Sequence, residues 1–159
     1  MKFKILLPSL LLFSFSLSAQ KASKTYAITG DGNNDYLWMN IRQVDLNTGK
    51  IQNTIFEKNK TAYSLTDVNS RQSVSQAAIT DANIYTNRNY PTATFVAAAA
   101  FDKRTDKLFF IPMRLNELRW IDVSNQNANA KFYSVSSSLL PISNGTDESA
   151  HITRLVIAA

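Results

Sequence analysis

The side chains that carry out most enzyme chemistry are scarce in this chain. It contains no cysteine, and His151 is its only histidine. Thiol catalysis, Cys-ligated metals and iron–sulfur clusters are therefore excluded, and a metal centre built from several histidines lacks its ligands. We expect His151 to be a solvent-accessible polar residue, and the sequence assigns no catalytic, metal-binding or cofactor-binding residue.

Carboxylates are the next candidates, because two Asp or Glu side chains that converge on a cleft can hydrolyse a glycosidic bond. The pairs that lie close in sequence are Asp102 with Asp106, Glu117 with Asp122, and Asp147 with Glu148. Each pair borders a segment of turn-forming residues. We therefore interpret these acids as solvated turn residues rather than as catalytic pairs.

A run of oxygen-bearing side chains between Asp31 and Asp35 resembles the start of a calcium-binding loop. The loop fails further on, because Tyr36 stands where it needs Gly and Arg42 stands where it needs a bidentate Glu. We interpret the run as a turn held by Asx hydrogen bonds. An irregular calcium site that borrows a distant carboxylate remains the alternative.

Aromatic side chains could also form a platform for carbohydrate. The candidates are Trp38, Trp120, Tyr36, Phe109, Phe110, Phe132 and Tyr133. They lie in predicted strands, where large aromatic side chains normally pack between sheets. We expect them to belong to the core, with Trp120 the strongest exception, because Arg119 and Ile121 on either side of it compete for the inward face.

The first twenty residues have the layout of a secretory signal peptide. Lys2 and Lys4 precede an apolar core from Ile5 to about Leu17, and the small residues Ser18 and Ala19 follow it. We expect cleavage after Ala19 and a periplasmic or extracellular protein. An uncleaved membrane anchor is the alternative, but the apolar core is shorter than the roughly 20 residues that a membrane span needs. No later apolar run reaches that length, so we expect no transmembrane segment.

The net charge does not indicate a nucleic-acid partner. Because Lys2 and Lys4 leave with the signal peptide, the formal charge of +5 falls to +3. The remaining basic side chains are scattered among acids and strands and do not form a block. We therefore expect no nucleic-acid partner.

From Lys24 onward, short apolar segments alternate with polar turns without helical periodicity. This pattern predicts an all-β fold of antiparallel strands. In a first unit, residues 25–56, strands are predicted at 26–29, 36–46 and 51–56, with a tight turn at Gly49, which can take a positive φ. In a second unit, residues 92–135, the strands are 92–101, 107–113, 117–123 and 130–135. The run Ala97 to Ala100 is also good helix material, but the β-branched and aromatic residues before it favour a strand.

Three segments lie outside these units. Residues 57–91 form a polar insertion, which we expect to be either a projecting β-hairpin or a long irregular loop. Residues 136–150 form a linker with turn chemistry at Asn144-Gly145. Residues 151–159 are interpreted as the first strand of a further unit, so we expect residues 20–159 to be the N-terminal part of a longer domain.

An internal repeat connects the two units. The segment Ile41–Asn47 aligns with Leu118–Ser124 as aliphatic, Arg, any residue, aliphatic, Asp, aliphatic and small polar. The copies lie 77 residues apart, whereas propeller repeats run about 40 to 50 residues, and the polar insertion accounts for the excess. We expect Asp45 and Asp122 to close their strands by accepting hydrogen bonds from backbone N–H groups of the turn.

The stretch AFDKRTDKLFFIPM followed by LRWIDV resembles the blade pattern of secreted bacterial β-propeller proteins with WD40-like or NHL-like repeats. The resemblance covers residues 25–159 and implies a partial β-propeller of about two blades, built from antiparallel four-stranded meanders. The Gly-His and Trp-Asp pairs that mark WD40 repeats themselves are absent. Such families bind proteins, glycans or peptides on one face of the disc, and no site residue carries over.

These observations predict an exported, non-catalytic binding or interaction module of the propeller type, without a cofactor. We expect it to contact the remaining blades of a longer chain, or to associate with itself through open strand edges. Two alternatives remain: a hydrolase or lactonase-like propeller enzyme whose active-site residues lie on further blades, and a structural component of a cell-envelope assembly.

Overall fold

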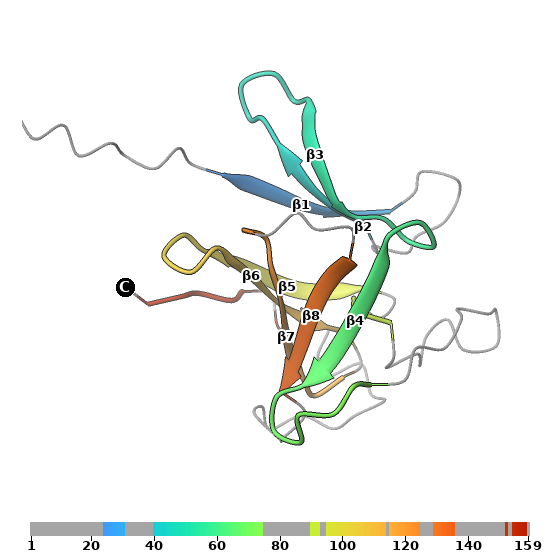
Figure 1. Cartoon of the computed structure of the whole chain (residues 1–159). Helices are drawn as coiled ribbons and strands as arrows, with labels where there is room; N and C mark the ends of the chain where they lie inside the picture. The colour runs from blue at the N-terminus through green and yellow to red at the C-terminus, as the bar shows by residue number, and fades with distance from the viewer. Residues whose placement is uncertain are drawn as a thin grey trace, which may run out of the picture.

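A computed structural model of the chain describes residues 24–30, 40–74, 90–92, 95–113, 115–124, 129–135, 152 and 154–158. The signal peptide, the Asp31–Asp35 run, Tyr36, Trp38, the Asp147 and Glu148 pair and His151 lie outside these residues. Within them the regular structure is eight β-strands in two sheets, and the predicted all-β class is confirmed (Figure 1). The described residues include no helix long and apolar enough to cross a membrane.

The first sheet is an antiparallel meander in the order β1-β2-β3. Its strands are β1 (Thr25–Thr29), β2 (Asn40–Val44) and β3 (Ile51–Phe56). The turn between β2 and β3 closes where Gly49 adopts a φ of 68° and its N–H donates to the carbonyl of Asp45 at 2.8 Å. A positive φ at this position is what the sequence predicts for Gly49.

The second sheet contains the predicted four-stranded meander. Its strands β5 (Val96–Asp102), β6 (Lys107–Pro112), β7 (Leu118–Asp122) and β8 (Asn129–Val135) pair in antiparallel succession. The alanine run lies in β5, so the strand interpretation is confirmed over the helical one. Pro112 ends β6, where the loss of one backbone donor disturbs the ladder least.

A fifth strand, β4 (Ala62–Asp67), comes from the polar insertion and pairs with β8 in parallel. Its far edge is covered by the chain itself, because Val74 N–H donates to the carbonyl of Leu65 at 2.7 Å and Asp67 N–H donates to that of Gln72 at 2.9 Å. Neither form predicted for the insertion, a projecting hairpin or an irregular loop, includes a strand that joins the second sheet. A parallel pair requires a long crossover, and local alternation of residue types carries no trace of it.

The strand register gives the second sheet two distinct faces, because successive side chains of a strand point to opposite sides. One row across all five strands consists of Leu65, Phe132, Ile121, Leu108 and Phe101. We call the face that carries this row, which is turned toward the first sheet, the inner face. The next row belongs to the outer face and consists of Thr66, Tyr133, Trp120, Phe109 and Ala100.

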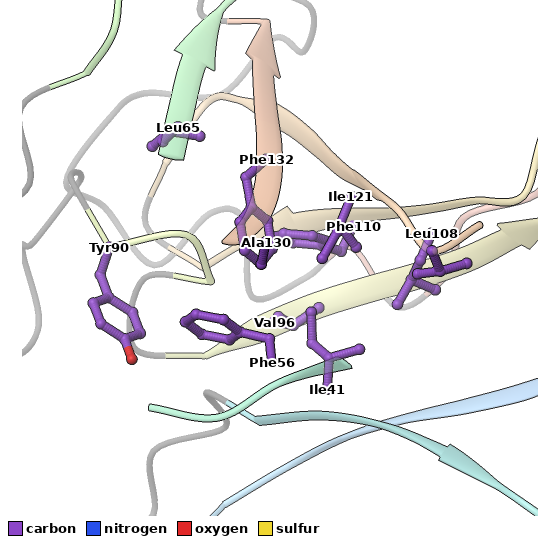
Figure 2. Close-up of a cluster of buried hydrophobic side chains, with 11 residues drawn as sticks. Ile41, Phe56, Leu65, Tyr90, Val96, Leu108, Phe110, Ile121, Ala130 and Phe132 are labelled. Atoms are coloured by element: carbon purple, nitrogen blue, oxygen red, sulfur yellow. The ribbon is translucent and has the colours of Figure 1, made fainter. Parts of the chain in front are cut away.

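The core lies between the two sheets. Figure 2 shows Ile41 and Phe56 of the first sheet pointing toward Val96, Ala130 and Phe132 of the second. The ring of Phe56 meets that of Phe132 edge to face, with centroids 5.1 Å apart, and both side chains are fully buried. The face of the first sheet that carries Ile41 and Phe56 is therefore its own inner face.

Replacing Phe56 by Ala tests this packing. We expect Phe56→Ala to lower the free energy of unfolding by about 3–5 kcal/mol, because it removes a buried ring from the contact between the sheets. Urea denaturation measures the change. The matched control is Ile51→Ala on the same strand, where the side chain is exposed and the expected loss is below about 0.5 kcal/mol. Equal losses for the two variants would contradict the arrangement.

Candidate functional site

Three aromatic side chains line the outer face of the second sheet, one on each of β6, β7 and β8. Phe109 and Trp120 have ring centroids 5.6 Å apart, and Trp120 and Tyr133 have centroids 5.5 Å apart with their planes at 19°. All three are half-buried. The ammonium of Lys107 lies 6.0 Å from the centre of the Trp120 ring, at the limit of a cation–π contact. We call these three residues the outer aromatic row.

The aromatic candidates thus divide by face. Phe110 and Phe132 are fully buried on the inner face, as a core interpretation predicts. Trp120 lies on the other side, so its choice as the exception agrees with the structure. For Phe109 and Tyr133 the core interpretation was wrong. The alternation that turns Arg119 and Ile121 inward turns Trp120 outward, and Phe109 and Tyr133 are the cross-strand partners of Trp120.

The geometry of the outer aromatic row favours contact with protein over contact with sugar. A sugar ring binds on an exposed face of an aromatic ring. Trp120 and Tyr133, however, are nearly parallel at 5.5 Å, so each covers one face of the other. The row is suited to packing beneath another apolar surface.

A buried ion pair lies on the inner face. Arg119 is 1% exposed, and its Nε and Nη2 both donate to Oε2 of Glu117, at 3.0 and 2.8 Å. Its Nη1 donates to the carbonyls of Tyr90 and Pro91 at 2.6 and 2.9 Å. The hydroxyl of Ser134 on β8 donates to the same Oε2 at 2.8 Å. This network fastens the segment around Tyr90 to the end of the sheet.

The sequence interpretation of Glu117 as a solvated turn acid is wrong. Glu117 is buried, and Asp122 lies at the opposite end of β7, so the two do not form a carboxylate pair. Arg119 had been grouped with the scattered basic residues. The signal that could have identified the network is the alternation in Leu118–Asp122, which places Arg119 on the same face as the apolar Ile121.

Strand-closing aspartates form the second group of candidates, and they have a structural role. Oδ1 of Asp45 accepts from Asn47 N–H at 2.8 Å and Oδ1 of Asp122 accepts from Ser124 N–H at 2.9 Å, which confirms the prediction made from the repeat. Asp102 closes β5 in the same way. The backbone N–H of Arg104 and the hydroxyl of Thr105 donate to its carboxylate, at 3.0 and 2.9 Å. These hydrogen bonds, with that of Arg104 N–H the largest contribution, hold the pKa of Asp102 below its usual value.

Asp106 is not a partner for Asp102 in acid–base catalysis, since its carboxylate is engaged elsewhere. Oδ1 of Asp106 lies 3.4 Å from Nζ of Lys24, which links the second sheet to the start of the first. Its charge also acts on Tyr26, whose ring packs edge-on against Phe101 at 4.8 Å. Burial, assisted by the negative charge of Asp106, raises the pKa of Tyr26 to about 12.

Among the described residues, no group of three or more His, Cys, Asp or Glu side chains is placed to hold a metal ion. One hollow of about 330 Å³ opens beside the β2–β3 turn, lined by Thr25, Val44, Asp45, Leu46, Asn47 and Gln52. Its lining contains one carboxylate, that of Asp45, whose Oδ1 is held by the turn.

The buried ion pair makes a stability prediction. We expect Arg119→Met to lower the free energy of unfolding by about 3–5 kcal/mol, because it leaves the Glu117 carboxylate buried without its partner. The matched control is Arg42→Met, the corresponding position of the repeat, which is only half-buried and should lose less than about 1 kcal/mol. Adding Glu117→Leu to Arg119→Met should recover part of the loss. Urea unfolding that ranks the two single variants equally would refute the buried role of Arg119.

Tyr26 makes a prediction about alkaline pH. Its folded pKa of about 12 lies above the usual 10, so the unfolded chain loses this proton first as the pH rises. The free energy of unfolding should therefore decrease between pH 10 and 12. Tyr26→Phe removes the ionising group. Its free energy of unfolding should therefore decrease less than that of the wild type between about pH 9.5 and about pH 11.5, as measured by urea denaturation at the two pH values. An unchanged pH dependence would show that Tyr26 does not contribute.

Three kinds of comparison bear on identity: with protein-family models, with curated proteins and with solved structures. None of them yields a match to this chain.

Proposed function

We propose that this chain is part of an exported, non-catalytic interaction module of the β-propeller type, whose two sheets are successive blades. The observation that carries the proposal is where the aligned repeat residues lie. Ile41 is on the inner face of the first sheet, whereas its counterpart Leu118 is on the outer face of the second. Arg42 lies on the outer face of the first sheet, whereas its counterpart Arg119 lies on the inner face of the second.

This reversal is what front-to-back stacking requires. In a propeller, each blade packs one face against the preceding blade and the opposite face against the following one. Of two equivalent residues in neighbouring blades, one then faces the interface that the two blades share and the other faces away from it. In two sheets related by a local two-fold axis, equivalent residues would instead both face the shared interface or both face away from it.

The order of the strands agrees with this proposal. The strands β1-β2-β3 of the first sheet and the strands β5-β6-β7-β8 of the second each follow chain order as an antiparallel meander. The alanine-rich β5 at one edge suits the centre of a disc, where blades converge and large side chains do not fit. The additional strand β4 lies beyond β8 at the opposite edge, where it would cover the rim.

A binding role is supported by how the candidate acids are used. Asp45, Asp102 and Asp122 are held by turn hydrogen bonds and Glu117 is held by Arg119, so these carboxylates stabilise the scaffold. The turns that follow β2 and β5 lie at the same end of the two sheets, since Lys24, next to the end of β2, is 3.4 Å from Asp106. Loops on a rigid scaffold commonly carry binding function. Lys103 and Arg104 are exposed at this end, with Nε of Arg104 paired to Oδ1 of Asp102 at 3.2 Å.

The test presents the purified chain, immobilised, to two probes: a panel of purified cell-surface polysaccharides and a fractionated extract of envelope proteins. We expect saturable retention of one class of ligand, recovered chemically unchanged. Lys103→Glu with Arg104→Glu should weaken retention about tenfold if the β5–β6 turn takes part.

Lys60→Glu is the control, since Lys60 is an exposed basic residue in the turn after β3, at the other end of the sheet. Hydrolysis of a lactone, ester or glycoside by the purified chain would contradict a non-catalytic module.

A further inference from the structure

We infer that a second copy of this chain docks head to tail, with the outer face of its first sheet packed on the outer aromatic row of the first copy. The inference rests on the proposed blade stacking and extends it from within one chain to between chains. It joins two surfaces that the internal repeat makes complementary.

Two exposed apolar side chains, one on the outer face of the first sheet and one in the adjoining β2–β3 turn, stand at positions that are buried in the other repeat. Leu46 is 76% exposed, whereas its counterpart Val123 is 2% exposed. The repeat aligns Val44 with Ile121. The strand partner of Val44 is Ile51, which is 56% exposed, whereas the strand partner of Ile121 is Phe132, which is fully buried. In the second sheet these positions are covered by the first sheet. In the first sheet no described residue covers them.

The same face carries a hollow and a cation. The hollow of about 330 Å³ is lined by Val44 and Leu46 together with the polar residues Thr25, Asp45, Asn47 and Gln52. Arg42, the counterpart of Arg119, lies on this face and donates to the hydroxyl of Thr29. Arginine is the cation that most often packs against aromatic rings.

The receiving surface is the outer aromatic row. By the repeat and the strand register, Phe109, Trp120 and Tyr133 correspond to Tyr26, Gln43 and Asn53 of the first sheet. Tyr26 packs against Phe101 of the second sheet at 4.8 Å. The contact between Tyr26 and the second sheet is therefore an example, within one chain, of the contact that we infer between chains. The outer aromatic row is more apolar than the corresponding residues Tyr26, Gln43 and Asn53.

Because the two surfaces differ, the contact is heterologous: each copy offers one of each and can bind a neighbour on both sides. This distinguishes it from pairing of open strand edges, in which backbone groups rather than side-chain faces meet.

Sedimentation equilibrium of the purified chain tests the association. We expect reversible self-association, and we expect Leu46→Asp with Ile51→Asp to raise the dissociation constant at least about tenfold, because two apolar contacts are replaced by charges. Both positions are exposed, so folding is not at risk. Val68→Asp, at another exposed apolar side chain, is the matched control and should associate like the wild type.

Fluorescence of Trp120 tests the location of the contact. The chain has two tryptophans, so Trp38→Phe leaves Trp120 as the only one. Its quenching by iodide should decrease as the protein concentration rises, and it should stay constant in the Leu46→Asp, Ile51→Asp variant. Association that leaves the quenching unchanged would place the contact elsewhere and overturn the inference.

Two further results would also overturn it: a chain that stays monomeric up to about 1 mM, or protection of Trp120 in a monomer by an added polysaccharide. Ligand retention at the β5–β6 turn involves neither Leu46 nor Ile51, so this inference and the proposed function can fail separately.

Discussion

The charge of Arg119 has to be neutralised inside the protein, and the way this is done determines the orientation of the second sheet. Its guanidinium binds Glu117 and the carbonyls of Tyr90 and Pro91, and Glu117 in turn accepts from Ser134. Removing one partner of such a network leaves a buried charge uncompensated, which is strongly unfavourable. Because side chains alternate along a strand, turning Arg119 inward turns Trp120 outward.

The functional surfaces follow from that orientation. Ile121, Phe110 and Phe132 join Arg119 on the inner face and pack against Ile41 and Phe56 of the first sheet. The outer aromatic row stands on the other side, half-buried, with rings that stack on each other. The first sheet shows the matching asymmetry, since its inner face is covered while Ile51 on its outer face and Leu46 in the adjoining turn are exposed. A module with two different faces is suited to serial stacking.

Local sequence signals predicted the elements well and the long-range contacts poorly. Alternation and turn chemistry gave the strands, the Gly49 turn and the hydrogen bonds of Asp45 and Asp122, because each depends on neighbours in the chain. The parallel pairing of β4 with β8 was missed, since the partners are more than sixty residues apart. The burial of Glu117 was missed for a similar reason. Its partners are Arg119, which also binds the distant carbonyls of Tyr90 and Pro91, and Ser134 on β8.

The second sheet turns the face with Phe132 and Arg119, and not the face with Trp120, toward the first sheet. Nuclear Overhauser contacts from the ring protons of Phe56 measure this directly in the purified chain. The structure predicts strong contacts to the ring of Phe132, whose centroid lies 5.1 Å away, and none within the same molecule to the indole of Trp120. Strong intramolecular contacts from Phe56 to Trp120, without contacts to Phe132, would mean that the sheet is turned the other way.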